Sequence, residues 1–163
     1  MHLDAFDELG LDPSFDLDDA AIQGAYLARS ARLHPDLAGD EADFQALARL
    51  NQARADLLDP ERRGSVLLAR LGGPSKESNR SLPDGFLPRV MEVQEAIEEA
   101  RSAGDDLDTW RTWAESERAE IIADVAPRFA AAQADPAPER LADIRTRLNA
   151  WRYIERIIEQ LDA

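Results

Sequence analysis

The apolar residues of the chain recur at spacings of three and four along most of its length. This spacing places them on one side of an α-helix, whereas a strand would alternate apolar and polar residues. The pattern predicts helices within residues 15–34, 41–58, 59–73, 86–104, 106–134 and 138–163. Residues that favour helices (Ala, Leu, Arg, Glu) are abundant and strand formers are sparse. We therefore expect an all-α protein.

The first two predicted helices have definable apolar faces. In residues 15–34, where Asp18 or Asp19 can cap the first turn, the face consists of Ile22, Tyr26 and Leu33. In residues 41–58 it consists of Phe44, Leu47, Leu50 or Asn51, Arg54, and Leu57 or Leu58. Two such faces separated by a short connection favour an antiparallel pair of helices.

Prolines mark several expected helix boundaries. Pro35 disfavours helical geometry at the residue before it, so the first helix should stop at His34. Asp59 followed by Pro60 fits an N-cap followed by a first helical residue. Pro127 lies inside residues 106–134 and should kink or break that helix.

The segment "GGPSKESNRSLPDG", residues 72–85, divides the chain. It is rich in glycine, proline and serine and carries no periodic apolar face, which is typical of a boundary. We expect an N-terminal helical domain over 1–73, a linker over 74–84, and a C-terminal domain over 85–163. The three C-terminal helices, joined by short turns, predict a three-helix bundle.

The composition excludes several kinds of function. A net charge of −14, from 33 acidic and 19 basic residues, opposes binding to nucleic acid or to an anionic membrane. The chain has no cysteine and two histidines, so we expect no disulfide, no metal site and no cofactor. The N-terminus lacks a signal-peptide pattern and no segment is long and apolar enough to span a bilayer. We expect a soluble, cytoplasmic protein.

A His-Pro-Asp tripeptide, His34, Pro35 and Asp36, stands between the first two predicted helices. Taken alone, such a tripeptide is most often only a loop. Its surroundings, however, resemble a J-domain: Tyr26 lies eight residues before the histidine, Leu33 lies directly before it, and "DPERR" follows the second helix. The resemblance implies a loop that docks on a DnaK-type chaperone ATPase and stimulates ATP hydrolysis.

In the J-domain interpretation, the tripeptide forms the chaperone-binding site and Arg29 and Arg32 supply positive charge beside it. This chain departs from the J-domain pattern in two ways. Leu37 and the acidic segment "LAGDEAD" follow the tripeptide where J-domains usually carry a base, and the preceding helix is only weakly basic. Attraction to an acidic partner should therefore be weaker and less dependent on salt.

The resemblance narrows to HscB-type co-chaperones. It is carried by "DELGLDPSFDLDD", "LNQARADLLDPERRGSVLLARLGG", "FLPRVMEVQEAIEEA" and "WRYIERIIEQLDA". Members of that family deliver the iron–sulfur scaffold IscU to the DnaK-like chaperone HscA. By position, the resemblance implies a client-binding patch at Leu87, Met91 and Tyr153, with Pro88 where a larger apolar residue is usual. Ordinary packing in the bundle core is the alternative for each of these residues.

Other functions remain open from the residues alone. The chain could be a J-protein with a different client, or a non-catalytic helical protein that self-associates through its C-terminal bundle. An enzyme would need His34 as a general base oriented by Asp36. No nucleophile, metal cluster or phosphate-binding loop accompanies that pair, so we expect no catalytic residues.

Overall fold

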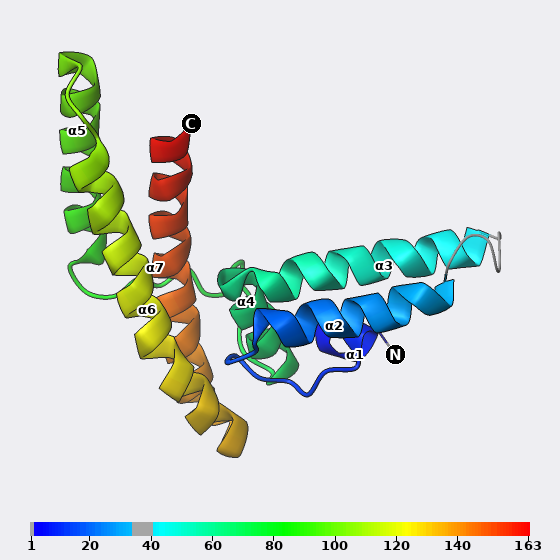
Figure 1. Cartoon of the computed structure of the whole chain (residues 1–163). Helices are drawn as coiled ribbons and strands as arrows, with labels where there is room; N and C mark the ends of the chain where they lie inside the picture. The colour runs from blue at the N-terminus through cyan, green and yellow to red at the C-terminus, as the bar shows by residue number, and fades with distance from the viewer. Residues whose placement is uncertain (1, 34–40) are drawn as a thin grey trace. The chain divides into compact units, whose positions relative to one another are not determined.

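The computed structural model describes residues 2–33 and 41–163. They form two compact units, Met1–Arg70 and Leu71–Ala163, whose helices are shown in Figure 1. The first unit contains α1 (Ala5–Leu9), α2 (Asp19–Ser30), the 3-10 helix η1 (Ala31–Leu33), α3 (Glu41–Leu58) and α4 (Pro60–Arg70). The second contains α5 (Phe86–Ala103), α6 (Asp108–Ala134) and α7 (Pro138–Asp162). No strand occurs in the described residues, so the all-α prediction is confirmed.

The short helix α1 was not predicted from the apolar pattern. Asp4 and Asp7 cap it reciprocally: the Asp7 N–H donates to Asp4 Oδ1 at 3.0 Å, and the Asp4 N–H to Asp7 Oδ2 at 3.2 Å. Gly10 ends the helix with a φ of 65°. The Arg29 guanidinium lies so close that a Cβ on Gly10 would be 2.1 Å from its Nη2 atom. The positive φ therefore favours glycine there, and a larger residue would also have to displace the flexible end of Arg29.

Helices α2 and α3 run antiparallel beside each other in the first unit (Figure 1). Asp18 is the cap of α2, because its Oδ1 accepts the Ala20 N–H at 3.1 Å. The Tyr26 hydroxyl of α2 donates to Asn51 Oδ1 of α3 at 2.7 Å. The Arg54 guanidinium lies 4.3 Å from the centre of the same tyrosine ring. We call Tyr26, Asn51 and Arg54 the clasp, since they join the two helices by a hydrogen bond and a cation–π contact.

The apolar face of α3 is buried over only part of its length. Its bounds, Glu41–Leu58, are those predicted. Leu50 and Leu57 are buried as expected, but the Phe44 side chain is 60% exposed. The prediction that groups Phe44 with Leu50 on one apolar face is therefore wrong. At about 100° per residue, the buried residues Leu50, Ala53 and Leu57 lie on one side of α3 and Phe44 points at least about 120° away from each of them.

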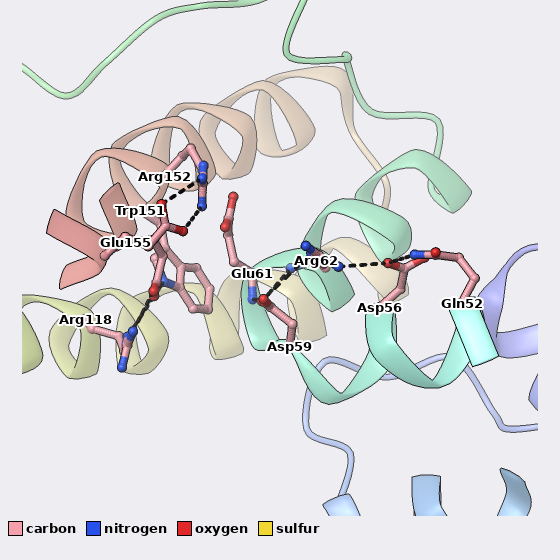
Figure 2. A network of polar contacts seen from close by, with 10 residues as sticks. Gln52, Asp56, Asp59, Glu61, Arg62, Arg118, Trp151, Arg152 and Glu155 are labelled. Carbon is pink, nitrogen blue, oxygen red and sulfur yellow. Dashed lines mark hydrogen bonds and ion pairs between the residues drawn. The ribbon is translucent and has the colours of Figure 1, made fainter. Parts of the chain in front are cut away.

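Helix α4 begins as its sequence predicts. Oδ1 of Asp59 accepts the backbone N–H groups of Glu61 at 2.9 Å and Arg62 at 3.1 Å, and Pro60 occupies the first helical position. The Arg62 guanidinium also pairs with Asp56 at 3.7 Å, as Figure 2 shows. These contacts join the end of α3 to the start of α4.

Helices α5, α6 and α7 share one core, which confirms the predicted three-helix bundle. The buried members of that core come from all three helices: Phe86, Val90, Ile97, Ala114, Ala150, Ile154, Ile157 and Leu161. Trp110 and Trp113 of α6 pack against it while staying partly exposed. The bundle therefore buries one side of each helix and leaves the other to solvent.

A glycine ends α5, whereas the proline inside α6 does not interrupt that helix. Gly104 ends α5 with a φ of 76°, and its N–H donates to the Arg101 carbonyl at 3.2 Å. Helix α6 continues from Asp108 to Ala134 through Pro127, so the proline does not break it. Pro127 and Ala123, four residues earlier, are both exposed, so solvent can satisfy the carbonyl that proline leaves without a donor.

Candidate docking surfaces

The three residues predicted to dock on a chaperone, His34, Pro35 and Asp36, lie outside the described residues. The structure describes the chain up to Leu33 and again from Glu41. Because α2 and α3 are antiparallel and joined by the clasp, these two residues lie at the same end of the first unit. The helices thus bring both flanks of the tripeptide segment to one end of the pair.

The two predicted basic residues both lie at this end and are exposed. Arg29 is in the last turn of α2, and its guanidinium lies against Gly10. Arg32 is in η1. Positive charge at the C-terminal end of a helix is stabilised by the helix dipole, which favours this placement. Two arginines are therefore available to an acidic partner.

Between Asp19 in its first turn and Arg29 in its last, α2 exposes only uncharged residues. These are Ala20, Ala21, Gln23, Gly24, Leu27 and Ala28. The Leu27 side chain is 64% exposed, and Phe44 at the start of α3 is also open to solvent. Sequence reasoning missed both as surface residues. For Leu27 there was a usable signal, because helical spacing puts it off the face formed by Ile22, Tyr26 and Leu33.

The first two residues of the predicted client patch are exposed on α5. Leu87 is 41% exposed and Met91, one turn later, is 52% exposed. Their neighbours Phe86 and Val90 are buried in the bundle core. The side chains of Phe86 and Val90 therefore point into the bundle, whereas those of Leu87 and Met91 point to solvent. We call Leu87, Met91 and the exposed Pro88 between them the α5 patch.

The third predicted client residue, Tyr153 of α7, is only partly exposed. Its ring meets that of Phe86 edge-on, with the ring centres 6.0 Å apart and an interplanar angle of 80°. The Arg156 guanidinium lies 5.9 Å from the centre of the Tyr153 ring. Tyr153 thus contacts the residue next to Leu87 in the chain, which brings it to the same end of α5 as the α5 patch.

A half-buried carboxylate, that of Glu155, fastens α7 to α6. Glu155 accepts from Arg118 Nε at 2.7 Å and from the second Arg118 nitrogen at 2.5 Å, and from Trp151 Nε1 at 2.7 Å (Figure 2). Burial by itself would raise the pKa of Glu155. The hydrogen bonds from Arg118 and Trp151, with the charges of Arg118 and Arg152, outweigh burial and hold that pKa below its usual value. Glu155 is therefore charged at neutral pH.

Within residues 2–33 and 41–163, no group of three or more His, Cys, Asp or Glu side chains is arranged to hold a metal ion. In the same part of the chain, no helix combines the length and hydropathy needed to cross a membrane. The described surfaces offer apolar, basic and hydrogen-bonding groups, which suit the docking of another protein.

Two solved structures that resemble this chain are HscB proteins. Chaperone HscB from Vibrio cholerae superposes with a TM-score of 0.79 at 21% identity, covering 98% of this chain and 96% of that one. Human co-chaperone HscB superposes with a TM-score of 0.82 at 22% identity, covering 98% and 81%. These superpositions show that the fold is shared from end to end.

Sequence comparisons agree with the fold. Residues 82–162 match the family model of the HSCB C-terminal oligomerisation domain. The co-chaperone HscB homologue of Ralstonia nicotianae is 34% identical over 107 residues, and the match spans 61% of each protein. The homologue of Bordetella avium is 29% identical over 174 residues, 98% of this chain and 96% of that protein. The chain is therefore similar to HscB-type co-chaperones in sequence along nearly its whole length, and it shares their fold.

Proposed function

We propose that this protein stimulates ATP hydrolysis by a DnaK/HscA-type chaperone and delivers to it an IscU-like scaffold during iron–sulfur cluster assembly. The observation that carries the proposal is the similarity to HscB co-chaperones across 98% of the chain, because it includes both units. One unit would act on the ATPase and the other would hold the client. The protein itself would perform no chemistry.

Docking of the tripeptide would provide the stimulation. Asp36 would accept hydrogen bonds from an arginine of the ATPase, His34 would add another hydrogen bond, and Pro35 would restrict the loop. A partner that binds the hydrolysing conformation of the ATPase more tightly than the resting one shifts the population towards hydrolysis. Arg29 and Arg32, both exposed at this end of the first unit, support the proposal by offering charge to an acidic surface.

The α5 patch would hold the client. Leu87 and Met91 are each about half exposed. A partner that covers them would gain roughly 1 kcal/mol of binding free energy per side chain from the apolar surface that is buried. Phe86 and Val90 lie buried behind them, which holds α5 firmly against the bundle and keeps the ordering cost of binding low. Tyr153, at the same end of α5, would extend the contact.

The test measures steady-state ATP hydrolysis by an HscA-type and by a DnaK-type chaperone, with and without this protein and an IscU-like scaffold. We expect this protein to stimulate the HscA-type enzyme, the scaffold to raise that stimulation further, and His34→Gln to abolish it. Stimulation of the DnaK-type enzyme alone would refute the iron–sulfur client. Stimulation of neither would refute the J-protein function.

The client surface is tested by the double variant Leu87→Ser/Met91→Ser. We expect scaffold binding to weaken about 30- to 100-fold, which corresponds to roughly 2–3 kcal/mol. The control is Glu99→Ser/Ala103→Ser, which introduces the same residues at the same spacing on exposed positions further along α5. Equal scaffold affinity of both double variants would exclude the α5 patch as the client site.

Self-association is a second candidate function for the C-terminal unit. It is favoured by the description of the matching family model as an oligomerisation domain and by the exposure of the α5 patch. Sedimentation equilibrium distinguishes it from client binding. A mass that rises with concentration in the wild type, and falls to that of a monomer in Leu87→Ser/Met91→Ser, would assign the patch to a second copy of the chain.

A further inference from the structure

The segment expected to be a linker is hydrogen-bonded to α7. Nε of Arg145 donates to the Pro74 carbonyl at 2.9 Å. Nδ2 of Asn149 donates to the carbonyls of Asn79 at 2.9 Å and Ser81 at 3.0 Å. Because Arg145 and Asn149 are four residues apart, they lie one turn apart on the same face of α7. Two side chains thus hold three backbone carbonyls of residues 74–81.

The held segment also has internal structure of its own. The Asn79 N–H donates to the Ser75 carbonyl at 3.0 Å, and the Ser78 N–H donates to the Ser75 hydroxyl at 3.2 Å. The Ser81 N–H donates to Asn79 Oδ1 at 2.9 Å. Leu82, directly after the segment, packs against the bundle core. Residues 74–82 are therefore a folded part of the second unit although they carry no helix.

This leaves three residues, Leu71, Gly72 and Gly73, between the end of α4 and the first held carbonyl. Gly72 has a φ of 81°, and nothing lies within 4 Å of the place where its Cβ would be. We propose that Arg145 and Asn149 form a latch that shortens the tether between the two units from residues 71–81, which precede the packed Leu82, to Leu71–Gly73. The latch positions the units for their joint action rather than contacting a partner.

The difference in reach is large. Four Cα–Cα steps, from Arg70 to Pro74, span at most about 14 Å. With the latch open, residues 71–81 would behave as a flexible chain with a root-mean-square length of about 18 Å and a maximum of about 37 Å. The local concentration of one tethered unit around the other falls steeply as the tether lengthens beyond the distance that it needs to span. A short tether therefore keeps a client held by one unit near whatever the other unit binds.

Distance measurements test the latch without any partner. The chain has no cysteine, so Gln23→Cys on α2 and Glu95→Cys on α5, both at exposed positions, allow one label to be placed on each unit. The latch variant is Arg145→Met/Asn149→Ala. The control is Arg152→Met/Gln160→Ala, which also removes one guanidinium and one carboxamide group, elsewhere on α7. We expect the inter-label distance distribution to broaden about twofold or more in the latch variant only.

An unchanged distribution in the latch variant would overturn the proposal, and so would equal broadening in the control. If Arg145→Met unfolds the bundle, Asn149→Ala alone decides the question, because alanine preserves the helix while removing two of the three bonds. That single variant should show part of the broadening.

A second measurement asks whether the latch matters to function, and it rests on the proposed function. Opening the latch should leave stimulation of the ATPase without scaffold unchanged, while the additional stimulation by scaffold falls severalfold. Loss of both would point to unfolding instead of a longer tether. Because the distance measurement needs no chaperone, the latch can fail while the proposed function stands, and the proposed function can fail while the latch stands.

Discussion

The Glu155 network makes a quantitative prediction about the stability of the bundle. In Glu155→Gln, the side chain keeps one acceptor but loses its charge, and its amide group cannot accept from Arg118. Two charge-assisted hydrogen bonds at 2.7 and 2.5 Å are affected, each worth about 1.5–3 kcal/mol. Because Arg118 is partly exposed, the low end of that range applies. We expect the free energy of unfolding to fall by about 2–3 kcal/mol.

The assay is urea unfolding followed by tryptophan fluorescence. All three tryptophans of the chain, Trp110, Trp113 and Trp151, lie in the second unit, so their fluorescence reports on the bundle. With an m-value of about 1–3 kcal/mol per molar urea, the midpoint should drop by roughly 1–2 M. Glu159→Gln is the matched control: it is the same substitution one turn later, in an exposed pair with Arg152. Its cost should stay below about 0.5 kcal/mol.

The lowered pKa of Glu155 also predicts that the stability difference between wild type and Glu155→Gln depends on pH. Since the pKa of Glu155 is lower in the folded protein, its contribution to stability is complete above the usual pKa of 4.5. The contribution is lost as the pH falls through the lowered pKa of the folded state. The gap between wild type and Glu155→Gln should therefore narrow below pH 4.5. If the stability difference between wild type and Glu155→Gln stayed constant below pH 4.5, so that both proteins lost stability equally, the reasoning would be refuted.

Three further predictions concern the first unit and are checked by circular dichroism and ATPase assays. Gly10→Ala should lower the free energy of unfolding by at least about 1–2 kcal/mol, because its φ is positive and the new Cβ must displace the Arg29 guanidinium. Gly24→Ala should raise it by up to about 1 kcal/mol, because Gly24 lies inside α2 and its Cβ would meet nothing within 4 Å. Equal effects of the two substitutions would contradict this. Tyr26→Phe keeps the ring but loses one hydrogen bond, so the free energy of unfolding should fall by about 1 kcal/mol. No measurable fall would show that the hydrogen bond of the clasp does not stabilise the unit. Phe44→Ser should leave the unfolding free energy unchanged within about 0.5 kcal/mol while lowering stimulation of the chaperone; a large loss of stability would show that Phe44 packs.

Local signals in the sequence were sufficient for most helix boundaries. Helix α3 matches its predicted bounds, Asp59 caps α4, and Gly104 ends α5. Each of these boundaries is set by groups within a few residues of one another. Helix α1 was missed because five residues are too few to show an apolar period, although the capping pair and Gly10 were signals that could have revealed it.

The surfaces could not be derived in the same way, because burial depends on neighbours that are distant in the sequence. Phe86 and Leu87 are adjacent and both apolar, yet the first is buried and the second exposed. Phe44 follows the helical spacing of Leu47 and is nonetheless open to solvent. The bonds from Arg145 and Asn149 to residues 74–81 link parts of the chain about 70 residues apart. No periodicity in either segment indicates them.

The clasp has a consequence for how this protein can change over evolution and in the laboratory. Tyr26, Asn51 and Arg54 set the spacing of α2 and α3 from positions well inside the pair, so that spacing does not depend on the residues that connect the helices. Residues 37–40, which follow the tripeptide, can therefore be exchanged while His34, Pro35 and Asp36 are kept. A longer or more basic connection placed there leaves the helices unchanged, so the strength of the proposed chaperone docking can be adjusted separately from the fold.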